Sequence, residues 1–149
     1  MSESQASEAE ATPRHLWVIG IVSLLWNAMG AMDYVMTQTR NEDYMSAFTP
    51  EQLSFFYGFP TWVVATWAIA VWGGVVGSIL LLARKAVAVW VFLASLTAMV
   101  ITTIQNYVLS DGMKVIGDTF TLIFTAVIIA TALGLYLYAR TMQQRGVLK

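Results

Sequence analysis

Cysteine is absent from this chain of 149 residues, and His15 is its single histidine. Without cysteine there can be no disulfide, no thiolate nucleophile and no iron–sulfur cluster. One histidine excludes a two-histidine haem site within one chain, and the sequence shows no nucleophile–base pair and no metal-ligating cluster. We therefore expect no cofactor, no metal site and no catalytic residue, and we do not expect an enzyme.

Charged residues are also scarce. They make up 11% of the chain, against about 25% in soluble proteins, whereas apolar residues reach 58%, against about 45–50%. No basic patch is present that could bind nucleic acid. This composition places the chain in a lipid bilayer.

Four long apolar runs follow one another, at residues 15–38, 61–83, 86–109 and 117–138. Each is close to the length of about 20 residues that a membrane-crossing helix needs. We predict an all-α integral membrane protein with one four-helix transmembrane bundle over residues 15–140. A signal peptide is the competing interpretation of the first run, because Ala28-Met29-Gly30 resembles a cleavage site. The run exceeds the about 7–15 residues of a signal core and follows an acidic segment, so we expect a retained helix.

The segments outside the runs have distinct compositions. Residues 1–14 are rich in serine, glutamate and alanine, which predicts a disordered tail. The connection 39–59 contains a typical helix start, with Thr49 as N-cap, Pro50 at the first helical position and Gln52 three residues after the cap. We therefore predict a short helix within this connection.

That short helix is amphipathic, because Leu53, Phe56 and Tyr57 fall on one face. One interpretation is a helix that lies at the membrane surface. The other is a capped loop helix packed over the bundle, which makes the same contacts. The sequence leaves both open.

The basic residues predict the orientation. Arg40 and Lys114 lie on one side of the predicted membrane. The basic residues on the other side are Arg14, Arg84, Lys85, Arg140, Arg145 and Lys149. The positive-inside rule then places both termini in the cytoplasm, the connection 39–59 in the periplasm and residues 141–149 in a basic cytoplasmic tail. We expect a multi-pass protein of the bacterial inner membrane.

Polar side chains gather in the leaflet on the periplasmic side, most of them about 6–12 Å above the midplane at a rise of about 1.5 Å per residue. The candidate polar intramembrane site consists of Asn27, Asp33, Tyr34, Thr66, Thr102, Asn106 and Asp118. Such residues mark a ligand or ion site, or they stabilise helix contacts. Threonines often bond to their own helix, asparagines bond across helices, and Asp118 is placed to cap the fourth helix. We favour the structural interpretation.

Asp33 is the most informative of these residues. A carboxylate facing lipid at its depth costs on the order of 1–3 kcal/mol. We therefore expect it to face the bundle interior and to pair with a polar group of the third or fourth predicted helix. This orientation would let Asn106, Thr102 or Lys114 share its proton or charge.

Three glycines are predicted to be helix-packing positions. Gly30 shares a helix face with Asp33, and Gly73 and Gly77 form a G-x-x-x-G element in the second predicted helix. Small residues at this spacing let two helix backbones approach closely. The contact lies either within the bundle or between subunits.

The sequence also resembles a known group of proteins, through LWNAMGAMDYVMTQTR at 25–40, TPEQ at 49–52, FPTW at 59–62 and VWGGVVG at 71–77. These segments are similar to small four-helix inner-membrane proteins of Alphaproteobacteria that are uncharacterised and sometimes labelled sugar transporters. The resemblance covers the first two predicted helices and their connection. It implies the same fold and orientation, and it carries no site residue.

Two functions fit these observations. The first is a non-catalytic accessory or assembly subunit that packs through its helices against other membrane-protein subunits or against itself. The alternative is a transporter or binding protein for a small, sugar-like solute with a polar site in the outer leaflet. The expected partners are the lipid bilayer and membrane-protein subunits, with a small solute under the alternative.

Overall fold

The computed structural model describes residues 12–149, which form helices and no strand. The predicted disordered tail, residues 1–14, lies almost wholly outside the described residues. The helices are α2 (Arg14–Gln38), α3 (Glu42–Met45), α4 (Pro50–Tyr57), α5 (Thr61–Leu82), α6 (Ala88–Ile104), the π-helix η1 (Gln105–Leu109), α7 (Gly112–Val115) and α8 (Thr119–Gln144).

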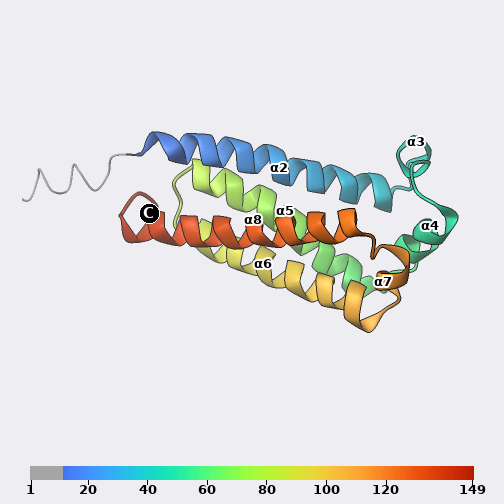
Figure 1. The fold of residues 1–149 in the computed structure, drawn as a ribbon. Helices are drawn as coiled ribbons and strands as arrows, with labels where there is room; N and C mark the ends of the chain where they lie inside the picture. The colour runs from blue at the N-terminus through green and yellow to red at the C-terminus, as the bar shows by residue number, and fades with distance from the viewer. Residues whose placement is uncertain (1–11) are drawn as a thin grey trace, which may run out of the picture.

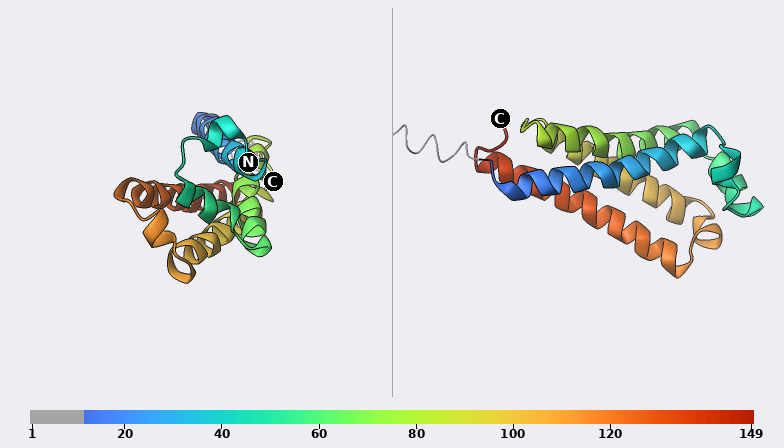
Figure 2. Two further views of the ribbon diagram at one scale, coloured as in Figure 1. Left: turned by 90° about the vertical axis from the view of Figure 1, so that its right-hand side faces the viewer. Right: turned by 90° about the horizontal axis from the view of Figure 1, so that it is seen from above.

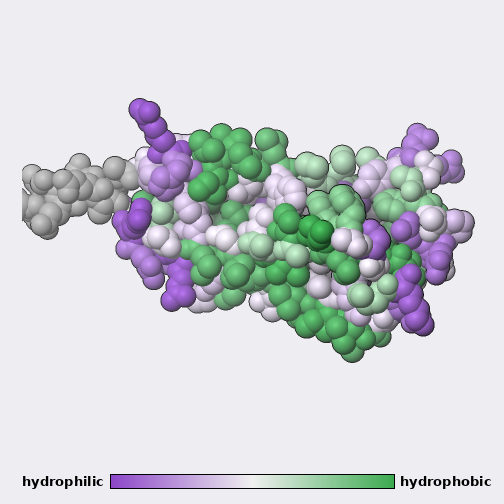
Figure 3. Space-filling view, viewed as in Figure 1, coloured by the Kyte–Doolittle hydropathy of each residue, from purple (hydrophilic) through white to green (hydrophobic). Residues whose placement is uncertain are grey.

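Four helices are long and apolar enough to cross a membrane, namely α2, α5, the continuous helix formed by α6 and η1, and α8. An apolar belt separates two more polar ends of the molecule in Figure 3. These features confirm the prediction of an all-helical chain with four potential membrane-crossing helices.

The four long helices pack in a fixed order of neighbours (Figure 1). α5 lies between α2 and α6, and α6 lies between α5 and α8. The end of the bundle that holds Arg14 and Lys149 is called the terminal end here, and the opposite end, with α3, α4 and α7, is called the loop end. Figure 2 shows that α8 and α2 diverge toward the loop end. The bundle is therefore closed at one end and splayed at the other.

Three helices end in the same way. Arg40 after α2, Arg84 after α5 and Gly146 after α8 have φ angles of 53°, 58° and 77°. After α2, the amide of Asn41 donates to the carbonyl of Met36 at 3.0 Å, which is the Schellman arrangement. A side chain costs about 1–2 kcal/mol in this left-handed conformation. Both arginines therefore hold a backbone conformation that glycine would adopt at lower cost.

The apolar core lies at the terminal end. Its largest fully buried side chains, one from each long helix, are those of Leu16, Leu81, Phe92 and Met142. All four long helices therefore meet at this end, and the burial of their side chains is the main force that holds them together.

The end of the chain belongs to this core. The sequence predicts residues 141–149 as a basic tail, whereas Val147 and Leu148 are buried among the core residues. The amide of Lys149 also donates to the carbonyl of Arg84 at 3.0 Å. The segment is rich in basic residues, but the chain turns back after α8, and its two apolar residues, Val147 and Leu148, pack into the core.

The short helix α4 begins as its sequence indicates. The amide of Gln52 donates to Oγ1 of Thr49 at 3.2 Å, and the amide of Thr49 donates to Oε1 of Gln52 at 3.1 Å, which completes a capping box. α4 contacts α2 and α7, although none of its residues is buried. It therefore lies across the loop end of the bundle.

Candidate functional site

The seven residues of the candidate polar intramembrane site do not converge on one point. Asn27 belongs to the contact between α2 and α5, where its Nδ2 donates to the carbonyl of Ser23 at 2.8 Å and to Oγ of Ser78 at 3.3 Å. A Cβ on Gly74 would lie 2.2 Å from Oδ1 of Asn27. The asparagine thus fills the space above a glycine and joins the two helices.

Gly73 and Gly77 form a second close contact, between α5 and α6. A Cβ on Gly73 would lie 3.0 Å from Cβ of Ser95, and a Cβ on Gly77 would lie 2.6 Å from Cε1 of Phe92. The hydroxyl of Ser95 also donates to the carbonyl of Ala70 at 2.5 Å. The structure therefore places the G-x-x-x-G element inside the chain's own bundle.

Gly30 is not a point of close approach. A Cβ there would make only an ordinary contact, 3.7 Å from Cγ1 of Val71. The tight position in the terminal half of α2 is Gly20, where a Cβ would lie 2.5 Å from Cδ2 of Leu82. Sequence reasoning missed Gly20 because it stands alone among large residues and forms no motif.

Thr66 and Thr102 do meet, one on α5 and the other on α6. Their hydroxyl oxygens lie 3.0 Å apart. Each hydroxyl also lies within hydrogen-bond distance of a carbonyl of its own helix. Thr66 is 2.9 Å from the carbonyl of Val63, and Thr102 is 2.8 Å from the carbonyl of Ala98. The two side chains satisfy each other and leave little capacity for a ligand.

Asp33 pairs with a different part of the chain from the one expected. The hydroxyl of Tyr44 in α3 donates to Oδ1 of Asp33, and within residues 12–149 Asp33 forms no hydrogen bond to α6 or α8. The reason is that α3 folds back beside the last turns of α2 and brings Tyr44 within reach. Burial, the hydrogen bond and the negative charge of Asp33 together raise the pKa of Tyr44 to about 12.

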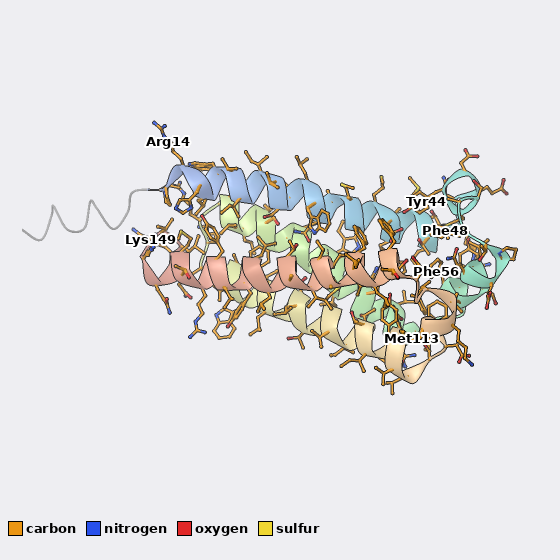
Figure 4. All side chains as sticks on the ribbon, in the orientation of Figure 1. Arg14, Tyr44, Phe48, Phe56, Met113 and Lys149 are labelled. Carbon is orange, nitrogen blue, oxygen red and sulfur yellow. The ribbon has the colours of Figure 1, made fainter. Side chains whose placement is uncertain are left out.

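Tyr34 belongs to a set of aromatic rings at the loop end. Its ring packs edge-on against Trp67 of α5, with centroids 4.8 Å apart. Further ring contacts, with centroids 5.2–6.3 Å apart, extend the set through α3 and α4. We call this set the loop-end aromatic cluster (Figure 4), and its members are Tyr34, Tyr44, Phe48, Phe55, Phe56, Phe59 and Trp67. Sequence reasoning missed the cluster, although the density of aromatic residues between 55 and 59 is a signal for it.

Asp118 caps α8. Its Oδ2 accepts from the amide of Thr121 at 3.1 Å, and its Oδ1 accepts from the hydroxyl of the same residue at 2.7 Å. These bonds lower the pKa of the exposed Asp118 carboxyl. The residue therefore has a structural role at the start of the helix, away from Asn27 and Asp33.

Asn106 differs from the other candidates. It lies in η1, and its Oδ1 is buried without a hydrogen-bond partner among the described residues. The backbone bends sharply just after it, because the hydroxyl of Ser110 lies 2.9 Å from its carbonyl and Gly112 packs directly against that carbonyl. The side-chain amide oxygen of Asn106 is therefore a hydrogen-bond acceptor without a donor among the described residues.

Residues 12–149 contain no group of three histidine or acidic side chains that could hold a metal ion. Pairwise contacts between neighbouring elements account for most of the candidate polar residues. No protein-family model matches this sequence, and no curated protein and no solved structure matches it.

Proposed function

We propose that this protein is a non-catalytic subunit of a membrane-protein assembly, and that α8 forms its interface with the assembly. The support comes from how little of α8 the chain itself covers. The buried residues of α8 are Leu135, Ala139 and Met142, all in its last ten residues. From Thr119 to Gly134 the helix has no buried residue, so a long face is free to receive another helix.

The composition of that free face is the observation that carries the proposal. Ala126, Ala130 and Gly134 are exposed and follow one another at intervals of four residues. A Cβ on Gly134 would have nothing within 4 Å. Small residues at this spacing let a second membrane helix approach closely, as Gly73 and Gly77 do within the chain.

The outer face of α2 has a different character. It exposes large aliphatic side chains, among them Val18, Ile21, Val22 and Leu25. Large flexible side chains suit contact with lipid tails, and they hinder close approach of a second helix. α8 also exposes large side chains, among them Phe120, Ile123 and Val127, so it is the row of small residues that favours α8 over α2 as the contact for a partner helix.

The polar contacts agree with a packing role. Asn27, Thr66 and Thr102 bond across or within helices, Asp33 bonds to Tyr44, and Asp118 caps α8. Polar side chains that bond to a single neighbour or cap a helix do not line a continuous path for an ion. The proposal therefore needs no transport step.

We further propose that the protein crosses the bacterial inner membrane with both termini in the cytoplasm. Support comes from the basic side chains, which are more numerous at the terminal end than at the loop end. Single cysteines at the exposed positions Ser46 and Gln144 would test this. An impermeant thiol reagent added from the periplasm should label position 46 only, and labelling of position 144 alone would reverse the orientation.

The test of the assembly role uses Gly134→Leu, with Ala28→Leu on the outer face of α2 as the matched control. Both positions are exposed, so neither variant should disturb the fold of the chain. We expect the native protein, extracted in a mild detergent, to run at a higher mass than its 16.5 kDa, and Gly134→Leu to abolish that mass.

Native mass spectrometry then identifies the partner. A mass that is a multiple of 16.5 kDa would indicate copies of this chain, and any other defined mass would indicate a different subunit. A monomeric native protein, or an equal effect of Ala28→Leu and Gly134→Leu, would contradict the proposal.

A further inference from the structure

A small cavity lies at the loop end, where the ends of α2 and α4 meet the start of α5. It is partly enclosed and measures ≈ 160 Å³. Its polar wall is formed by Thr37, Gln38 and Arg40, and its aromatic wall by Phe56, Tyr57 and Phe59. An engineered cavity of about 150 Å³ in another protein holds benzene, so this one has room for about six non-hydrogen atoms.

Thr37 supplies the first sign that the cavity binds a ligand. The residue as a whole is 4% exposed, and its hydroxyl, which is open to the cavity, has no hydrogen-bond partner among the described residues. Other threonines in the long helices, such as Thr97 and Thr103, donate to a carbonyl of their own helix. A hydroxyl that lines a cavity and has no partner in the chain can donate a hydrogen bond to a group bound there.

Arg40 supplies the second sign. Its guanidinium carbon lies 4.3 Å from the centroid of the Tyr57 ring, and no carboxylate of the described residues lies within ion-pair distance. Stacking on a ring leaves the N–H groups at the edge of a guanidinium free, and their fork geometry matches a carboxylate. The positive φ of 53° holds the backbone of Arg40 at the rim of the cavity.

The surroundings limit the charge of the ligand. Glu42, Asp43 and Glu51 are exposed on the same connection, and the carbonyl ends of α2 and α4 point toward this region. Both features oppose a multiply charged anion. One guanidinium can compensate one negative charge, and Phe56 and Phe59 offer contact for a short apolar tail.

We infer that this cavity binds a small organic monocarboxylate of about four to six non-hydrogen atoms. Its carboxylate lies against Arg40, with the Thr37 hydroxyl as a further donor, and its aliphatic part lies against the aromatic wall. This inference goes beyond the assembly role, because it concerns the opposite end of the molecule from the core and does not involve the free face of α8.

Propionate and its neutral isostere propionamide are suitable probes. The full chain is placed in nanodiscs of phosphatidylcholine, and binding is followed by saturation-transfer NMR of each probe. We expect transfer from aromatic protons of the protein to the propionate methyl group. Propionamide should bind about tenfold more weakly or worse, because it cannot form the charge-assisted pair with Arg40.

Arg40→Gly is the decisive variant, because glycine adopts a positive φ without strain and the chain should keep its fold. Arg84→Gly is the matched control, since it makes the same backbone change at the other end of the bundle. We expect Arg40→Gly to weaken propionate binding about tenfold or more and Arg84→Gly to leave it unchanged. Thr37→Val, which has a similar shape but no hydroxyl, should weaken binding by about two- to tenfold.

Four outcomes would overturn the inference. Equal binding of propionamide would show a site for neutral solutes. Displacement of propionate by inorganic phosphate, or by nanodiscs that contain phosphatidylglycerol, would show a phosphate site or a lipid headgroup site. Binding that survives Arg40→Gly would place propionate elsewhere. No saturation transfer to either probe would show a cavity that holds water alone.

Discussion

The terminal and loop halves of the bundle are held together by different forces. At the terminal end, apolar side chains from all four long helices are buried together, and the last residues of the chain seal them. At the loop end, α8 diverges from α2. There the elements are connected by short helices, by contacts between aromatic rings and by pairs of polar groups. Dispersion and close packing dominate the first half, whereas directional contacts dominate the second.

This difference shows why polar residues at one depth do not make one site. Asn27 bonds to Ser78, Asp33 bonds to Tyr44, and the hydroxyl oxygens of Thr66 and Thr102 lie within hydrogen-bond distance. Each pair joins two elements that are already neighbours. The two pairs toward the loop end, Asp33 with Tyr44 and Thr66 with Thr102, can fail separately, whereas the terminal half should fail as one unit.

The largest effect is expected at the close contact between α5 and α6 in the terminal half. Gly77→Leu would drive a side chain into Phe92, because even a Cβ at this position would lie 2.6 Å from that ring. Overpacking of this kind should cost about 2–3 kcal/mol of unfolding free energy. Melting of the purified protein in detergent, followed by circular dichroism, measures the loss.

Ala28→Leu is the control for this experiment, because that side chain is exposed on the outer face of α2. Its effect on melting should stay within about 0.5 kcal/mol. Equal melting of the two variants would mean that the α5–α6 contact does not hold the terminal half together.

The sequence predicted the coarse architecture well, for a physical reason. Long apolar runs can satisfy their backbone groups in a bilayer only as helices, so length and hydropathy suffice to identify four of them. The start of α4 was equally predictable, because Thr49 and Gln52 bond locally to each other's backbone. Features that depend on residues close in sequence are the ones that sequence reasoning finds.

The candidate polar site was predictable only in part. The predicted depths put Thr66 and Thr102 in the same leaflet, and their hydroxyl oxygens lie 3.0 Å apart in the structure. The partner of Asp33 was not predictable, since the contact depends on how α3 folds back, and no periodicity encodes that turn. The burial of Val147 and Leu148 was hidden in the same way, because it depends on the turn that follows α8.

An intermediate effect is expected from Tyr44→Phe in the loop half. The variant keeps the ring that packs near Phe48 but loses the hydrogen bond to Asp33. A bond to a carboxylate near the surface is worth about 1 kcal/mol. Melting should therefore fall less than in Gly77→Leu, and hydrogen exchange should accelerate in α3 rather than in the core.

The pH dependence of the same variant gives a second measurement. The pKa of Tyr44 is raised from 10.0 to about 12, so its protonated form is favoured in the folded protein. The resulting stability is complete below about pH 10 and is lost as the pH rises through about 12. The difference in melting between the native protein and Tyr44→Phe should shrink over that interval, and a constant difference would exclude Tyr44 as its source.

The smallest effect is expected from Asp118→Ala at the start of α8, where the helix has few neighbours to loosen with it. The side chain of Asp118 holds the amide of Thr121, so its removal should fray the first turn and speed exchange of that amide severalfold. Asp118→Asn is the matched control, because asparagine caps a helix about as well without the charge.

The lowered pKa of Asp118 means that the charged cap stabilises the folded protein above the ordinary carboxyl pKa of 3.8 and loses its effect as the pH falls below that value. Exchange at Thr121 should therefore become more alike in the native protein and in Asp118→Asn as the solution is acidified. If Asp118→Ala instead lowers the melting of the whole bundle as much as Gly77→Leu does, then the start of α8 is coupled to the core, and the two halves do not fail independently.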